Sequence, residues 1–153
     1  MEALSTGSLA TPLGRMYITA DDVGLRRIAF VRPAWQAEET PLIRQAKAAL
    51  AAYFAGEKPV LALPLTITGT PFQRQVWQAL AGVPYGQTVT YGELAAQVGR
   101  PAAARAVGQA VHVNPLLILV PCHRVVAANG PGGFVAGLAR KQWLLAWEQA
   151  HCQ

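Results

Sequence analysis

The chain has few cysteines, few charged side chains and no long apolar run, and each shortage excludes a class of protein. Two cysteines in 153 residues, Cys122 and Cys152, make no disulfide framework, so we expect reduced thiols. Charged residues are 14% and apolar residues 52% of the chain, the reverse of the balance in a disordered protein. The longest clear apolar run, residues 116–120, is far below the ~18 residues of a membrane span. With no signal-peptide pattern at the start, we expect a compact cytoplasmic protein without membrane contact.

Acidic residues are also scarce, and they are scarcest in the second half. The chain has 13 basic and 8 acidic side chains, a net charge of +5. Residues 1–69 carry seven basic and six acidic side chains, whereas residues 70–153 carry six basic side chains and only Glu93 and Glu148 as acids. A basic half favours an anionic partner, nucleic acid first, and a solvated arginine-rich surface is the alternative.

A stretch rich in Pro, Thr and Gly, residues 57–71, separates two segments of different pattern and is the candidate linker. Before it, residues 13–32 have the pattern of a hairpin with an Asp- and Gly-containing turn, and residues 41–55 have the apolar spacing of a helix. The sequence therefore predicts an α+β protein. Its N-terminal α/β domain, residues 1–64, would hold an antiparallel sheet, and its C-terminal domain, residues 70–153, would be mainly helical.

The C-terminal segment contains two capping boxes, at residues 70–73 and 90–93, where a Thr is followed three residues later by Gln or Glu. The first predicts a helix to about residue 83, and the second predicts a short helix that ends at Gly99. After Pro101 a third helix is expected over residues 102–113. Two short helices with a three-residue joint fit a helix-turn-helix or winged-helix-like element. The third helix would be the recognition helix, although its many alanines also fit a helix buried on all sides.

Cys122 is the candidate nucleophile because His123 and Arg124 follow it directly. Cationic neighbours lower the pKa of a thiol and raise its thiolate fraction, and a neighbouring histidine can act as its base. Adjacent residues of an extended chain point in opposite directions, so contact between Cys122 and His123 is not implied. From these residues alone, a buried and inert cysteine is an equal alternative.

Residues 121–125, Pro-Cys-His-Arg-Val, resemble the active-site motif of the O6-alkylguanine-DNA alkyltransferases, which repair alkylated guanine. Further features of that family occur at matching spacing: Tyr91, Arg105 within residues 103–108, Asn114-Pro115, Trp143-Leu144-Leu145 and Glu148. The resemblance covers residues 70–150 and continues more loosely through residues 11–14, 24–25 and 53–56. It implies the activity of a methylated-DNA–protein-cysteine S-methyltransferase.

The resemblance implies a role for each catalytic candidate. Cys122 would keep the alkyl group as a thioether, an irreversible step, so each molecule would act once. His123 would be the base, reaching the thiol through a water, and Glu148 would orient it. Tyr91 would donate a hydrogen bond or proton to the departing guanine, and Asn114 would tie the recognition helix to the active-site segment. Arg124 would be structural.

The resemblance also implies double-stranded DNA as the partner, bound through the minor groove with the damaged base flipped out. The side chain of Arg105 would fill the gap that the flipped base leaves in the base stack of the duplex. The remaining DNA-binding candidates are Thr90, Ala104, Ala106, Gly108 and Gln109. A helix face without base-reading side chains reads the DNA backbone rather than its sequence, so we expect sequence-tolerant binding. We also expect a monomer that associates with the nucleoid.

The substrate pocket implied by the resemblance contains Tyr91, Leu117, Phe134, Val135 and Ala136. Relatives often have a small polar residue where Val135 stands, and this departure bears on the substrate range rather than on the reaction. O4-alkylthymine is a second candidate substrate. No cofactor is expected. No metal is expected either, because no Cys or His precedes His112 and the later pairs have unsuitable spacing for zinc.

Three other classes compete with this hypothesis. A non-catalytic relative that only recognises lesions would lack the motif cysteine, which is present here as Cys122. A cysteine hydrolase would use Cys122 and His123 but has no evident oxyanion arrangement and no need for a helix-turn-helix. A transcription regulator would need base-reading side chains on the recognition helix. Mass analysis after incubation with methylated duplex separates these classes.

Overall fold

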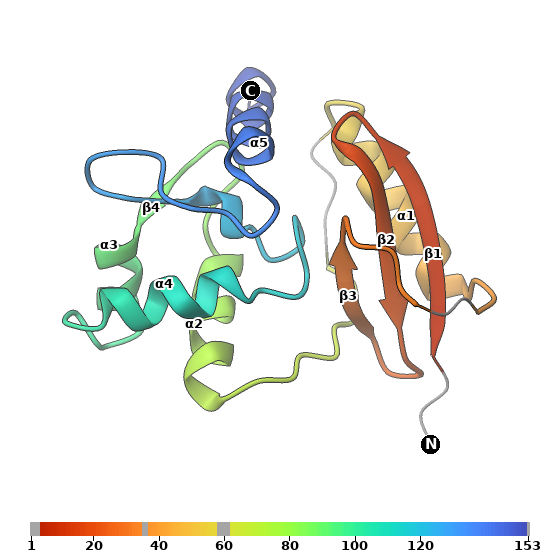
Figure 1. Ribbon diagram of the computed structural model, residues 1–153, viewed down its shortest axis with the longest axis horizontal. Coiled ribbons are helices and arrows are strands. Elements are labelled where there is room, and N and C mark those ends of the chain that lie inside the picture. The colour runs from red at the N-terminus through yellow and green to blue at the C-terminus, as the bar shows by residue number, and fades with distance from the viewer. Residues whose placement is uncertain (1–3, 35–36, 58–61, 153) are drawn as a thin grey trace. The chain divides into compact units, whose positions relative to one another are not determined.

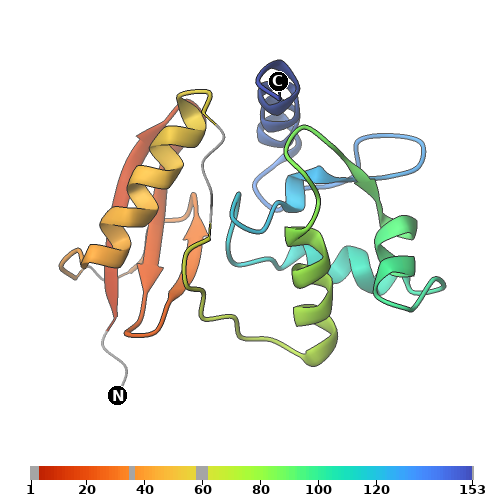
Figure 2. The same cartoon turned by 180° about the vertical axis from the view of Figure 1, so that it is seen from behind.

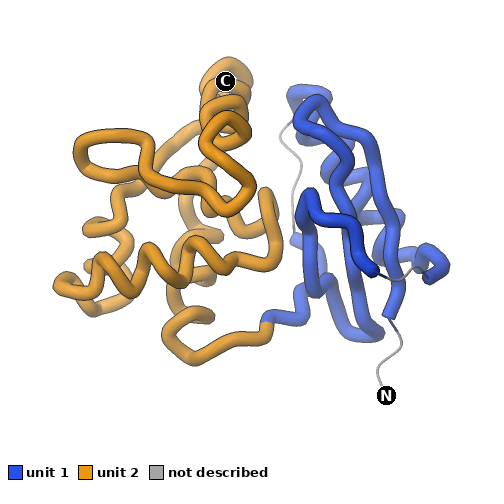
Figure 3. Tube along the Cα trace, in the orientation of Figure 1, with its two compact units in different colours: residues 1–67 blue, residues 68–153 orange. Residues whose placement is uncertain are grey.

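The chain is described by a computed structural model at residues 4–34, 37–57 and 62–152, and it forms two compact units. Residues 1–67 make the first unit and residues 68–153 the second (Figure 3). The division falls inside the Pro-, Thr- and Gly-rich stretch, of which residues 58–61 lie outside the described residues. Within the described ranges, no helix is both long enough and apolar enough to cross a membrane.

The first unit is a three-stranded antiparallel sheet with one helix packed on it (Figures 1 and 2). Its elements are β1 (Ser5–Thr11), β2 (Gly14–Ala20), β3 (Leu25–Ala29) and α1 (Pro41–Phe54), and the strand order is β1-β2-β3. The predicted hairpin is confirmed as β2 and β3, and Asp21 Oδ1 closes its turn by accepting the N–H groups of Val23 and Gly24 at 2.8 Å each. The strand β1 was not predicted.

The core of the first unit lies between α1 and the sheet. Thr40 caps α1, and its buried face carries Ile43, Ala46, Leu50 and Tyr53. The sequence spacing predicts a buried stripe that begins at Leu42, but Leu42 is only partly buried, so the true face is rotated slightly from the predicted one. The sheet contributes the completely buried side chains Met16, Ile18, Ala20, Leu25 and Ile28.

The second unit is mainly helical, so the expected α+β class is confirmed. Its elements are α2 (Pro71–Ala81), β4 (Val89–Thr90), α3 (Tyr91–Gln97), α4 (Ala104–His112), a 3-10 turn (Cys122–Arg124), β5 (Val125–Val126) and α5 (Leu138–Ala150). Both predicted capping boxes are present, at Thr70 before α2 and at Thr90 before α3. The two-residue strands β4 and β5 pair in parallel, Val89 with Val125, which holds the start of α3 beside the chain that leaves Cys122.

The helices α3 and α4 pack against each other as the predicted helix-turn-helix pair. Gly99 ends the first helix at a φ of 77°, where a side chain would be strained, and Arg100 N–H bonds back to Ala95 C=O. The helix α4 begins at Ala104, two residues later than expected, and Ala103 offers no capping side chain. The alternative of a helix buried on all sides is wrong, because Arg105 is exposed and only one stripe of α4, Val107, Ala110 and Val111, is buried.

Candidate active site

Cys122 lies in a 3-10 turn that follows a buried segment, residues 116–120. That segment is not a strand, because Ile118 has a φ of 73° and Val120 N–H bonds back to Leu116 C=O. The left-handed conformation is rare for a β-branched residue and marks backbone strain just before the cysteine. The chain at Cys122 is therefore a 3-10 turn and not an extended segment, so the alternation of side chains along an extended chain does not apply to Cys122 and His123.

The thiol of Cys122 is only 1% exposed, and this burial decides its ionisation. Burial raises the pKa of the thiol to about 11, although hydrogen bonding to the Asn114 side chain and the charge of Lys141 act in the opposite direction. The expected lowering of the thiol pKa is thus wrong for this state of the protein. Near neutral pH, Cys122 is a thiol, and it needs a base to become a nucleophile.

Asn114 connects the end of α4 to the segment before the cysteine. Its side-chain NH2 donates to Val120 C=O at 2.8 Å, and its side-chain oxygen accepts the N–H of Leu116 at 3.0 Å. Both bonds are buried, and together they span residues 116–120. Asn114 therefore ties the chain just after α4 to the backbone that leads to Cys122.

His123 and Glu148 form a buried pair, with His123 Nε2 at 2.6 Å from Glu148 Oε2. Burial alone would raise the pKa of Glu148, but hydrogen bonds from His123 and Arg124 and the charge of Arg124 outweigh it and lower that pKa to about 2. An ionised carboxylate can only accept, so Nε2 carries the proton of this hydrogen bond. The pKa of His123 is lowered, mainly by burial, so the neutral ring has its lone pair on Nδ1. That atom is buried and meets no hydrogen-bonding partner among the described residues.

Arg124 binds the other side of the same carboxylate. Its Nε donates to Glu148 Oε1 at 2.8 Å, and its Nη2 donates to Glu148 Oε2 at 3.0 Å. The third nitrogen, Nη1, donates to Val83 C=O at 2.7 Å, and the guanidinium lies over the Tyr85 ring at 5.6 Å from its centroid. Glu148 therefore holds two consecutive residues of the 3-10 turn, His123 and Arg124.

Lys141 is a buried cation that sequence reasoning missed. Its Nζ donates to Val125 C=O at 2.5 Å and to Gly133 C=O at 2.8 Å. Burial lowers the pKa of Lys141 to about 8, and the negative charge that Cys122 carries when it is ionised opposes that shift. A weak signal was available, because Lys141, Leu144 and Glu148 share the three- and four-residue spacing of one helix face.

The apolar pattern of the last helix predicts that Trp143, Leu144 and Trp147 face inward. Leu144 is buried in α5, but Trp143 and Trp147 are only partly buried. The two indole rings stack on each other at 4.9 Å between centroids. Lys141 and Glu148 share the buried face of α5 with Leu144.

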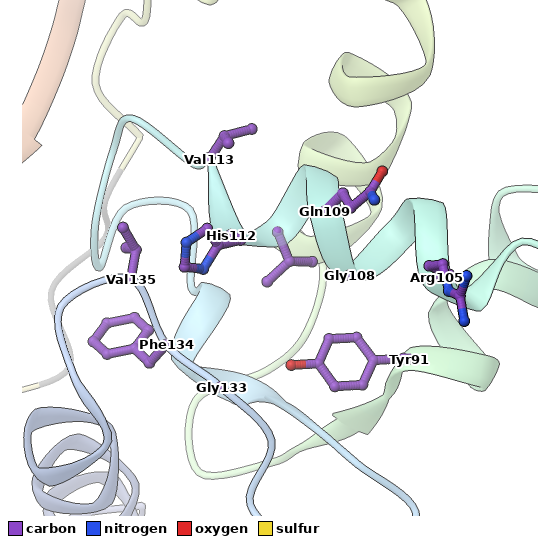
Figure 4. Close-up of a pocket in the computed structure, with 10 residues that line it drawn as sticks. Tyr91, Arg105, Gly108, Gln109, His112, Val113, Gly133, Phe134 and Val135 are labelled. Carbon is purple, nitrogen blue, oxygen red and sulfur yellow. The ribbon is translucent and has the colours of Figure 1, made fainter.

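A cavity of about 430 Å³ opens between α4, the start of α3 and the loop before α5 (Figure 4). It is lined by Tyr91, Arg105, Gly108, Gln109, Val111, His112, Val113, Gly133, Phe134 and Val135. Tyr91 fits closely, because a Cβ on Gly108 would lie 3.7 Å from its ring and a Cβ on Gly132 would lie 2.8 Å from its hydroxyl. Three predicted pocket residues, Tyr91, Phe134 and Val135, line this cavity, whereas Leu117, Ala136 and Cys122 do not.

The DNA-binding candidates divide by exposure. Arg105, Ala106 and Gln109 are exposed on α4, and Ala104 and Gly108 are half-buried. Arg105 projects from α4 on the same side as Tyr91 (Figure 4). Thr90 is engaged within the protein, because its hydroxyl accepts the N–H of Glu93 in the capping box of α3.

Comparison with known proteins assigns both units to one family. The model for the 6-O-methylguanine DNA methyltransferase DNA binding domain matches residues 71–150, and the model for the ribonuclease-like domain of the same proteins matches residues 4–67. The chain is 42% identical over 146 residues to a methylated-DNA–protein-cysteine methyltransferase of Methanosarcina acetivorans, covering 90% of this chain and 94% of that one. It is 43% identical over 148 residues to one of Mycolicibacterium paratuberculosis, covering 92% and 90%.

Solved structures agree. The Mycobacterium tuberculosis O6-methylguanine methyltransferase has a TM-score of 0.88 at 36% identity, with 97% of this chain and 94% of that chain covered. The M. tuberculosis protein in complex with DNA has a TM-score of 0.89 at 37% identity, with 96% and 94% covered. With family models over most of its length and relatives above 40% identity, this chain belongs to the 6-O-methylguanine DNA methyltransferase family.

Proposed function

We propose that this chain is a DNA repair protein that transfers the alkyl group from O6 of guanine in duplex DNA to Sγ of its own Cys122. Its relatives are named methylated-DNA–protein-cysteine methyltransferases, and one neighbouring structure holds DNA. The observation that carries the proposal is the buried 2.6 Å hydrogen bond between His123 and Glu148, directly after the cysteine. That bond places the ring proton on Nε2, and burial keeps the ring neutral, so its other nitrogen can take a proton.

In the proposed reaction, the thiol proton passes to Nδ1 of His123 through a bridging water. Sγ then attacks the alkyl carbon in line, the new S–C bond forms, and the bond from that carbon to O6 breaks. The electron pair of the broken bond stays on the guanine. A base is required because the pKa of the buried thiol is raised to about 11. The transient imidazolium is stabilised by the ionised Glu148.

Tyr91 is the proposed proton donor to the departing guanine. Its ring lies under α4 with the hydroxyl directed towards the segment that carries Gly133 (Figure 4). The hydroxyl would neutralise the negative charge that builds on the base as the alkyl group leaves. The close fit of Tyr91 against Gly108 and Gly132 limits the positions that this hydroxyl can take.

The target atom is inside the duplex, so the guanine must leave the stack to reach a cysteine that is 1% exposed. We propose that α4 enters the minor groove and that Arg105 fills the gap. Arg105, Ala106 and Gln109 are exposed on α4, and the small side chain of Ala106 permits close approach to the backbone. Binding would be sequence-tolerant and strongly dependent on salt, since phosphate contacts supply most of the affinity.

The thioether product leaves no route back to the thiol, so each molecule would act once. The protein would act as a monomer and associate with the DNA of the cell. The cavity beside Tyr91, Phe134 and Val135 would also admit O4-alkylthymine as a second substrate. Incubation of the protein with duplex containing one O6-methylguanine, followed by intact mass and peptide mapping, tests the reaction. We expect a stoichiometric gain of one methyl group on Cys122. Tight binding without any mass change would instead indicate a lesion-recognition protein.

A further inference from the structure

The hydrogen bonds of Arg124 connect it directly to the His123–Glu148 pair. All three of its nitrogens donate at 2.7–3.0 Å, two of them to the carboxylate of Glu148. Arg124 is 7% exposed, and Glu148 is 1% exposed. A bidentate pair in such a site is strong and directional, and a lysine cannot reproduce it.

The charge of Arg124 changes what Glu148 can do to His123. A buried carboxylate facing only an imidazole would draw a second proton onto that ring, because the ion pair is better than a lone buried anion. Arg124 already neutralises this carboxylate. The ring of His123 can therefore stay neutral while still donating Nε2–H to Glu148.

We propose that Arg124 is a positioning residue for alkyl transfer that acts through Glu148. Its guanidinium holds the carboxylate ionised and aimed at His123 Nε2, and so leaves the lone pair of a neutral ring on Nδ1 to receive the thiol proton of Cys122. The effect of Arg124 on the rate of alkyl transfer rests on the proposed function, but its effect on the tautomer and protonation of His123 does not.

Among the described residues, the other groups that face His123 come from α5, from its own turn and from the loop before α5. Glu148 and Lys141 face it from α5, Cys122 and Arg124 belong to its own turn, and the ring of Phe134 lies edge-on at 6.5 Å between centroids. Burial lowers the pKa of His123, the charges of Arg124 and Lys141 lower it further, and Glu148 opposes them. Loss of Arg124 therefore makes His123 gain its proton at a higher pH.

The test is 15N NMR of histidine-labelled full-length protein without DNA, as wild type, Arg124→Met and Arg124→Lys. In the wild type we expect one tautomer at His123, protonated on Nε2. In Arg124→Met we expect His123 to become charged at a higher pH. Arg124→Lys keeps the positive charge but cannot make both hydrogen bonds to the Glu148 carboxylate, so we expect a mixture of tautomers at His123. Arg74→Met removes an exposed cation of the same unit and should leave the His123 signals unchanged.

The pH dependence of methyl transfer supplies the second measurement. We expect its acid limb to move to higher pH in Arg124→Met, and the rate near neutral pH to fall about 10–100-fold, in the range of a displaced base. Unchanged His123 signals and an unchanged profile in Arg124→Lys would overturn the proposal, even if Arg124→Met fails to fold. The NMR result stands without any substrate, so a wild type that transfers no methyl group would refute only the proposed function.

Discussion

Lys141 and Glu148 lie seven residues apart on α5 and are both buried on one face, with Leu144 between them. Seven residues are close to two helical turns, so the two charged groups are aligned along the helix. Lys141 holds the carbonyls of Val125 and Gly133, and Glu148 holds His123. One helix therefore fixes both the turn that contains the cysteine and the loop that borders the cavity.

Replacement of Lys141 by methionine should raise the pKa of the Cys122 thiol and slow alkyl transfer. The positive charge of Lys141 lowers that pKa, and its removal also leaves the carbonyls of Val125 and Gly133 without their donor. A rise of one unit would cut the thiolate fraction about tenfold. Thiol reactivity with a small alkylating reagent across a pH series measures the change. Lys47→Met, on the surface of the first unit, is the control.

Replacement of Cys122 by alanine should abolish alkyl transfer and leave DNA binding largely intact, because binding is assigned to α4. Cys152→Ala is the matched control, since Cys152 is the other free cysteine and is partly exposed near the C-terminus. Intact mass after incubation with methylated duplex measures transfer, and fluorescence anisotropy measures binding. Transfer by Cys122→Ala at the wild-type rate would refute the assignment of the acceptor.

Replacement of Glu148 by glutamine keeps the size of the side chain but removes its charge. The imidazolium of His123 then loses its stabilising partner, so Cys122 should titrate at higher pH and transfer should slow by about 10–1000-fold, as expected for a base or its orienting group. The pH–rate profile is the measurement. A profile identical to that of the wild type would remove Glu148 from the mechanism.

The same carboxylate predicts how the protein responds to acid. The pKa of Glu148 is about 2 in the folded protein, against the ordinary value of 4.5. Between these pH values the unfolded chain binds more protons at this site, so stability rises with pH across the window. Acidification from pH 4.5 to 2 should therefore cost about 3 kcal/mol at this site. Chemical unfolding followed by tryptophan fluorescence should show a flatter pH dependence in Glu148→Gln than in the wild type.

Local signals in the sequence were sufficient for the helix starts and the hairpin. Thr70 and Thr90 form their capping boxes as predicted, because a capping box needs only residues within one helical turn. The strand β1 was missed because its sequence, Ser-Thr-Gly-Ser-Leu-Ala-Thr, is small and polar. It is held by pairing along the whole length of β2, which no local pattern reports.

The electrostatics of the site could not be predicted in the same way. Cationic neighbours of Cys122 suggested a lowered thiol pKa, but burial by residues distant in sequence raises it to about 11. Lys141 is buried because two backbone carbonyls, from β5 and from the loop before α5, turn towards it. Desolvation and such carbonyl partners depend on tertiary structure, so a sequence motif names the reacting groups without giving their ionisation.

Replacement of Arg105 by alanine separates DNA handling from chemistry. Arg105 is exposed on α4 and borders the cavity beside Tyr91, so it is placed to act on the duplex while the guanine enters (Figure 4). Repair of methylated duplex should slow far more than reaction with a small O6-alkylated guanine free in solution, because the free base needs no flipping. Gln109→Ala removes another exposed polar side chain of α4 and is the control for a general loss of contact area.

The decisive quantity is the ratio of the two rate losses in Arg105→Ala. A side chain that fills the vacated stack affects only the duplex reaction, whereas a side chain that shapes the cavity affects both. A loss in both reactions is the expected result if Arg105 shapes the cavity, which it lines together with Tyr91. Equal losses on duplex and free base would move Arg105 from the DNA surface to the pocket wall, and the base-flipping role assigned to it would be wrong.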